Sequence, residues 1–221
     1  MLQLATIDFL KELKLNNHKE WFEKNRKRYE YAKVDYLQLV GEVLKGVSDN
    51  DPSIAALQPK DCVFRINRDV RFSKDKSPYK TNMGAGFSKG GKKMVVAGYY
   101  LHLEPGSSFI AGGMWMPEAP SLKKIRQEID YCFDEFDGIV KAESFIKQLG
   151  SLENGSDVTL SRPPKGYEET NQAISYLKLK SFIATSPILD TELTSKELIP
   201  KIVAACAALQ PLVYFINRAL E

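Results

Sequence analysis

Three short strand patterns, separated by turn sequences, occupy the middle of this 221-residue chain. Residues 83–87 form a short glycine-containing pattern, residues 95–104 a longer one, and residues 109–115 a third. The turns between them are Lys89-Gly90-Gly91-Lys92 and Glu104-Pro105-Gly106-Ser107. Because consecutive strands joined by short turns pair with one another, this run predicts an antiparallel β-meander.

Apolar residues recur at helical intervals on both sides of the strands. Before them we expect a short helix capped by Thr6 and a long one that a capping box at Asn17–Glu20 opens and that continues to about Val47. After them we expect helices over residues 120–136, 142–149 and 168–177, a last helix opened at 194–197, and short strands at 157–160 and 179–184. No repeat or linker divides the sequence. We therefore expect a single α+β domain over residues 1–221, with an antiparallel β-meander sheet packed with N- and C-terminal helices.

Composition is that of a soluble globular protein, with 43% hydrophobic and 27% charged residues. Cys62, Cys132 and Cys206 are odd in number and far apart, which suggests buried thiols in a reducing compartment and neither disulfides nor a zinc site. The first residues lack the pattern of a signal peptide, and no apolar run approaches the ~20 residues of a membrane span. These features predict a cytoplasmic protein without a membrane partner.

Positive charge is concentrated in one segment. Residues 65–93 contain nine Lys or Arg and two Asp, a local balance of +7, whereas the whole chain carries +3. The rest of the chain therefore carries −4, and the electrostatic potential is focused on this segment.

The start of the basic segment alternates like a strand. From residue 63 to 72, apolar residues fall on one face and polar residues on the other, except that Arg68 falls on the apolar side. A half-buried guanidinium needs a partner, which Asp69, Asp75 or Glu104 would supply. Residues 73–81 contain a proline and no periodicity, which predicts a loop after the strand.

The motif Arg65-Ile-Asn-Arg-Asp-Val-Arg-Phe-Ser-Lys-Asp-Lys-Ser-Pro-Tyr-Lys-Thr81 resembles the hallmark of a bacterial and fungal family, the domain of unknown function numbered 2461. The similarity extends over nearly the whole chain. It includes Asn16-Asn-His-Lys-Glu-Trp-Phe22, Tyr99-Tyr-Leu-His-Leu-Glu-Pro-Gly106 and Arg162-Pro-Pro-Lys-Gly-Tyr167. The resemblance implies a fold and a site and carries over no activity, cofactor or partner.

Anion recognition is the chemistry that the segment favours. Guanidinium forks and lysine ammonium groups suit phosphate or carboxylate, and tyrosine adds a hydroxyl or a stacking ring. We expect a phosphate-bearing small molecule or another acidic ligand, with Asp69 organising the contacts, which are Arg65, Arg68, Arg71, Lys74, Lys76, Tyr79 and Lys80. The alternative is that the charges form an internal salt-bridge network, which serves stability or a protein partner.

Two further hypotheses remain open. Phe72, Tyr79 and Phe87 among the cations would stack nucleic-acid bases, although the pI of about 8.6 is below the ~9 of dedicated binders. An enzyme acting on a phosphoester would use Asp69, His102 or Glu104, with or without a divalent metal. His102 and Glu104 share a strand face with Tyr100 by period-2 spacing. No nucleotide-binding or hydrolase motif is present in the sequence, so no cofactor is assigned.

Overall fold

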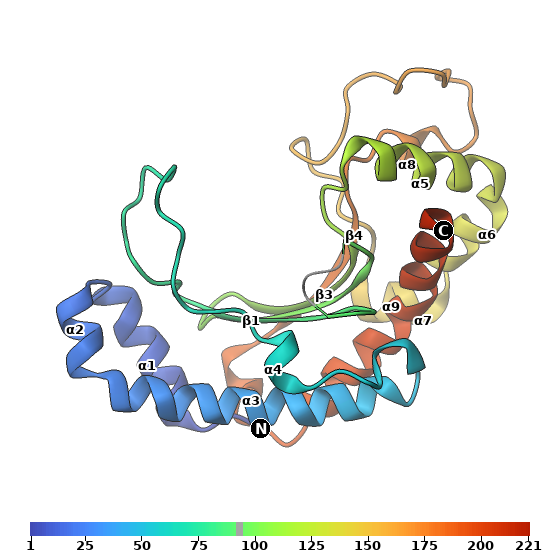
Figure 1. Cartoon of the computed structure of the whole chain (residues 1–221). Coiled ribbons are helices and arrows are strands. Elements are labelled where there is room, and N and C mark those ends of the chain that lie inside the picture. Colours follow the sequence, from blue (N-terminus) through green and yellow to red (C-terminus); the bar gives the residue numbers. More distant parts are fainter. Residues whose placement is uncertain (92–94) are drawn as a thin grey trace. The chain divides into compact units, whose positions relative to one another are not determined.

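The computed structural model describes residues 1–91 and 95–221 (Figure 1). Among these residues, four strands form one antiparallel sheet in the order β1-β2-β3-β4. The strands are β1 (Met83–Phe87), β2 (Gly98–Leu103), β3 (Ser108–Met114) and β4 (Phe182–Ile188). Sheet order follows chain order, so the predicted α+β class and the meander are confirmed. The end of the predicted Lys89–Lys92 turn lies outside the described residues.

The described residues pack as two compact units. The first holds residues 1–91, 100–110 and 187–203, and the second holds residues 95–99, 111–186 and 204–221. The prediction of one domain over the whole chain stays a prediction. The concentrated basic segment belongs to the first unit as far as it is described.

The first unit is built on a long helix. Its elements are α1 (Leu4–Leu15), α2 (Lys19–Lys24), α3 (Arg26–Ser48), η1 (Pro52–Ile54), α4 (Pro59–Cys62) and η2 (Asp190–Glu192), together with β1, parts of β2, β3 and β4, and the start of the last helix. Tyr36 of α3 is buried, and its hydroxyl donates to the Leu101 carbonyl at 3.3 Å. The apolar face that the helical spacing predicts therefore faces a core in α3, as such faces usually do.

Two N-terminal boundaries differ from the prediction. Helix α1 begins at Leu4, and Thr6 lies inside it, with its buried hydroxyl donating to Asp35 at 2.5 Å. The predicted long helix is two helices that meet at Asn25, and the cap of the first is the His18 ring, which accepts from the Trp21 N–H at 3.4 Å. The Asn17 side chain is used elsewhere, as described below.

The second unit contains α5 (Ala119–Tyr131), α6 (Phe133–Val140), α7 (Glu143–Leu149), α8 (Ile174–Leu177) and most of α9 (Leu198–Leu220). The rings of Phe136, Phe182 and Phe215 are fully buried and contact one another through Phe136. Gly113 has φ +116°, and a Cβ there would lie 2.0 Å from the Phe182 carbonyl oxygen, so strand packing at this point requires glycine.

Several predicted C-terminal elements are shorter than expected or shifted along the chain. The helix predicted over residues 168–177 is reduced to α8, and the strand predicted at 157–160 is one isolated bridge between Thr159 and Leu179. The strand predicted at 179–184 begins later, as β4.

Helix α9 is a longer apolar segment than the sequence analysis predicted. By length and composition it is the one helix among the described residues that would reach across a membrane. Half of its most apolar window is buried within the fold, and the core helix of a soluble protein meets the same criteria.

Candidate functional site

The basic motif forms an irregular hairpin whose arms are joined by isolated bridges, Val63 to Ala85 and Asn67 to Tyr79. Three backbone hydrogen bonds connect the arms: Phe64 N–H to Gly84 C=O at 2.9 Å, Lys80 N–H to Ile66 C=O at 2.8 Å, and Arg68 N–H to Pro78 C=O at 2.9 Å. From Phe64 to Ile66 the first arm advances two residues, whereas the opposite arm advances four. Two extra residues therefore bulge around Thr81–Met83 and interrupt the ladder.

The regular strand predicted over residues 63–72 is therefore wrong. Its alternation would have buried Phe64 and Phe72, yet both rings are exposed, and only Ile66 of the apolar series is buried. Among the described residues, no opposite strand continues the pairing beyond Arg68, so the apolar side lacks the cover that a paired strand would give. Figure 1 shows this segment, in teal, as a long loop that extends away from β1.

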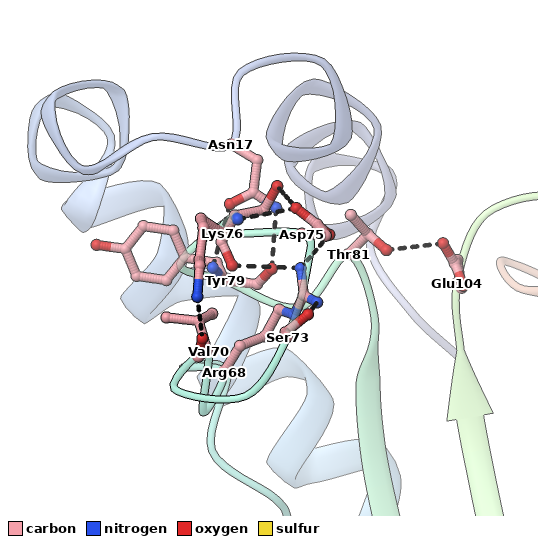
Figure 2. Close-up of polar contacts among 10 residues, drawn as sticks. Asn17, Arg68, Val70, Ser73, Asp75, Lys76, Tyr79, Thr81 and Glu104 are labelled. Atoms are coloured by element: carbon pink, nitrogen blue, oxygen red, sulfur yellow. Dashed lines mark hydrogen bonds and ion pairs between the residues drawn. The ribbon is translucent and has the colours of Figure 1, made fainter.

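Side chains close the tip of the hairpin onto itself (Figure 2). The half-buried Arg68 guanidinium pairs with Asp75 and also donates to the Ser77 carbonyl at 3.3 Å and the Ser73 hydroxyl at 3.4 Å. Asp75 accepts from the Ser77 backbone N–H and hydroxyl at 2.9 and 2.7 Å. These bonds, first from Ser77 and then from Arg68, hold the pKa of Asp75 far below its usual range. Of the three partners predicted for Arg68, which were Asp69, Asp75 and Glu104, the structure shows Asp75.

A second set of contacts fixes the hairpin to the connection between α1 and α2. The Asn17 side chain bonds both backbone groups of Tyr79: its amide donates to the carbonyl at 2.9 Å, and its oxygen accepts from the N–H at 3.1 Å. The Tyr79 ring is 6% exposed and stacks on Phe22 with centroids 3.9 Å apart. Tyr79 therefore anchors the loop, and its ring faces are not open to a ligand.

A polar pocket of about 330 Å³ lies between the hairpin and the end of α1. It is lined by Lys14, Asn17, Arg68, Asp75, Ser77, Tyr79, Lys80, Thr81 and Asn82. Three of these residues are cations and one is an acid. Lys14 is in an ion pair with Glu104, 3.4 Å away, and Arg68 is paired with Asp75.

Lys80 differs from the other cations of the pocket. Within residues 1–91 and 95–221 it has no carboxylate partner, and its ammonium lies over the Phe64 ring, 5.5 Å from the centroid. Burial lowers the pKa of Lys80, and the nearby Arg65 lowers it further. Both effects disfavour the charged ammonium, and an anion bound beside it would counter them by favouring the charged form.

Glu104 connects the pocket to β2. It accepts from the Thr81 hydroxyl at 2.8 Å, as Figure 2 shows, and lies 3.2 Å from His102 Nε2. Burial raises the pKa of Glu104, but the hydrogen bonds from Thr81, His102 and Lys14 together bring it below its usual value. The carboxylate is therefore ionised at neutral pH and accepts from all three.

Tyr100 completes a chain along this strand face. Its hydroxyl is 3.2 Å from His102 Nδ1, and the His102 ring stacks on Phe109 with centroids 4.7 Å apart. Since an ionised Glu104 only accepts, a neutral His102 carries its proton on Nε2 and accepts from Tyr100 through Nδ1. The face predicted by period-2 spacing thus forms one hydrogen-bonded chain. Gly84 makes room for it, because a Cβ there would lie 2.6 Å from the Tyr100 hydroxyl oxygen.

The remaining predicted contacts lie outside the pocket. Arg71 makes a bidentate pair with Asp69 at 2.9 and 2.6 Å on the exposed side of the loop, so Asp69 organises Arg71 alone. Lys76 donates to the Val70 carbonyl at 3.0 Å. Arg65 and Lys74 are exposed and form no hydrogen bond or ion pair in the described part of the chain.

Of the residues predicted to bind a ligand, Arg68, Tyr79 and Lys80 line the pocket and the other four do not. Sequence reasoning missed Lys14, Asn17 and Thr81. Asn17 and Thr81 lie within motifs that carry the family resemblance, which was the available signal. Lys14 lies on an unremarkable helix and gave none.

The described residues offer no metal centre with three protein ligands. Where the chain is described, no group of three His, Cys, Asp or Glu side chains is placed to hold a metal ion. Asp69 is occupied by Arg71, and Glu104 by Thr81, His102 and Lys14. The motif Arg162–Tyr167, which also contains two cations, belongs to the second unit, and its Arg162 and Lys165 are exposed.

Comparison with known proteins gives one match. The model of a family described as conserved hypothetical protein (DUF2461) matches residues 5–215. No curated protein and no solved structure matches the chain. Because the matched region covers nearly the whole sequence and includes both the hairpin and the Tyr100–Glu104 face, the chain belongs to the DUF2461 family.

Proposed function

We propose that the protein is an anion-binding domain that takes a phosphate-bearing or carboxylate-bearing small molecule in the hairpin pocket. The observation that carries the proposal is Lys80, a partly buried lysine that lines a polar pocket and has no carboxylate partner among the described residues. Lys14 lines the same pocket, and its ammonium has donors left for an anion beside the one directed at Glu104. The arrangement leaves one positive charge uncompensated where a ligand enters.

Glu104 and Asp75 shape the site without neutralising it. Each carboxylate is saturated by donors of the protein, Glu104 by three side chains and Asp75 by Ser77 and Arg68. They therefore orient Lys14 and Arg68 while Lys80 remains for the ligand. A hydrogen bond to a charged group contributes about 1.5–3 kcal/mol, so loss of the Lys80 side chain should lower the affinity for an anion about 10- to 150-fold.

The test is calorimetric titration with inorganic phosphate, sugar phosphates, nucleotides and dicarboxylates. Lys80→Ala should lose affinity by the factor above, whereas Lys89→Ala, an exposed lysine on the same segment, should bind like the wild type. Equal affinity of Lys80→Ala and the wild type would refute the pocket. A loss of affinity only in Arg71→Ala would also refute it and would place the anion at the loop tip.

An enzyme acting on an acidic substrate is the second candidate, and the Tyr100–His102–Glu104 chain favours it. Both ring nitrogens of His102 are engaged, one by a hydroxyl and one by a carboxylate, as in a general base that is oriented by an acid. Phosphoester turnover should then be lost in His102→Gln while anion affinity persists. Turnover that survives His102→Gln would remove this candidate.

A further inference from the structure

The hairpin exposes two phenylalanine rings that the strand pattern would have buried. Phe72 is 96% exposed and Phe64 is 36% exposed. A cation lies over each ring: the Arg71 guanidinium is 5.8 Å from the Phe72 centroid, and Lys80 is 5.5 Å from that of Phe64. Tyr79 and Phe87, the other rings considered for base stacking from the sequence, are buried and cannot take that role.

The exposed Phe72 lies in a loop that is held in shape. Before Phe72 in the chain, the Val70 carbonyl accepts from Lys76, and directly after it the Ser73 hydroxyl accepts from the Arg68 guanidinium. Asp75 fixes the return of the chain through Ser77. A self-bonded loop that presents an uncovered aromatic ring loses little conformational entropy when the ring is covered by a partner.

Positive charge follows the hairpin from its arms to its tip. Residues 64–81 contain six Lys or Arg and two Asp, a net charge of +4. Each Asp is paired with an arginine, which leaves four cations without acid partners in the described residues: Arg65 and Lys80 on the arms, and Lys74 and Lys76 near the tip, where Lys76 donates to the Val70 carbonyl. Aromatic rings and unpaired cations thus alternate along one structural element.

We propose that the hairpin of residues 63–81 binds single-stranded nucleic acid, with bases stacked on Phe72 and Phe64 and phosphates on Arg65, Lys74 and Lys80. Every base offers a π face, and a charged track beside aromatic rings is the arrangement that binds single strands without sequence preference. A bilayer surface would contact only the tip and leave Arg65 and Lys80 unused. The proposal rests on the proposed function only through Lys80, which contacts a phosphate in both.

The experiment is fluorescence anisotropy of the full chain with labelled dT12 and U12 oligonucleotides. Phe72→Ala should weaken binding about 5- to 150-fold, the effect of removing one stacked base. Phe64→Ala should weaken it to a smaller extent, because less of that ring is exposed. Tyr131→Ala is the matched control, since its ring is 90% exposed on α5 and it should leave affinity unchanged.

Salt dependence gives a second readout. Three phosphate contacts to a single strand predict a slope of log affinity against log salt of about −2, and Lys74→Ala should reduce the slope by about 0.7. Absence of oligonucleotide binding at 50 mM salt, or equal affinity of Phe72→Ala and the wild type, would overturn the proposal. So would binding to phosphatidylserine vesicles that depends on Phe72 while neither oligonucleotide binds. The two proposals can fail separately. Inorganic phosphate that binds in Phe72→Ala and does not bind in Lys80→Ala would support the pocket, whether or not the oligonucleotides bind.

Discussion

Replacing Asn17 by alanine should detach the hairpin from the helices that support it. The Asn17 amide satisfies both the N–H and the C=O of Tyr79, at 3.1 and 2.9 Å, and Tyr79 is itself buried against Phe22. Alanine leaves both backbone groups without this partner. An unsatisfied buried group costs about 1–3 kcal/mol, and partial access of water to this site favours the lower end, so the two together cost about 2–3 kcal/mol.

For a chain of this length, such a loss corresponds to a fall in Tm of about 4–12 °C. Urea unfolding gives the free energy of unfolding, and hydrogen exchange of the Tyr79 amide reports whether the hairpin opens locally. Asn50→Ala is the matched control, because Asn50 is exposed and its side chain forms no hydrogen bond within the described residues. If Asn17→Ala and Asn50→Ala unfold at the same urea concentration and Tyr79 stays protected, the anchoring role of Asn17 is refuted.

Two further predictions concern stability. Gly113→Ala should cost more than about 3 kcal/mol of unfolding free energy, because φ is +116° and the new methyl would meet the Phe182 carbonyl oxygen; an Ala variant that unfolds like the wild type in urea would contradict this. The bonds that lower the pKa of Asp75 stabilise the folded state. This stabilisation is fully present above the ordinary carboxyl pKa of 3.8, and it is lost as the pH falls through the lower pKa of the folded state. The difference in unfolding free energy between the wild type and Asp75→Asn should therefore be constant at pH 5–7 and shrink below about pH 4. A difference that grows on acidification would reverse the sign of this linkage.

The sheet was predictable because its signals are local. The sequence predicts residues 83–87 as a strand, and β1 has those bounds, since turn residues delimit it and alternation fills it. Alternation also occurs at residues 63–72, where no regular strand forms. Sequence periodicity records which side chains would share a face and carries no information on whether a neighbouring strand is present to pair with them.

The candidate site was only partly predictable for a related reason. The charge cluster located the hairpin, and the period-2 spacing of Tyr100, His102 and Glu104 predicted a shared face that the structure shows as a hydrogen-bonded chain. The contacts from Lys14 to Glu104 and from Asn17 to Tyr79 join residues 90 and 62 positions apart. Such pairings depend on how helices pack against the hairpin, which a single sequence does not encode in any local pattern.

Gly84 has a consequence for acid–base behaviour that reaches across two strands. The missing side chain lets the Tyr100 hydroxyl lie over β1, where it can donate to His102 Nδ1. That donation matches the tautomer that the ionised Glu104 requires, with the ring proton on Nε2. The hydrogen bonding of His102 beside the pocket therefore depends in part on Gly84, a residue whose side chain takes no part in it. Any larger residue at position 84 would shift the phenol and leave His102 Nδ1 without this donor, while the Glu104 carboxylate would still favour the proton on Nε2.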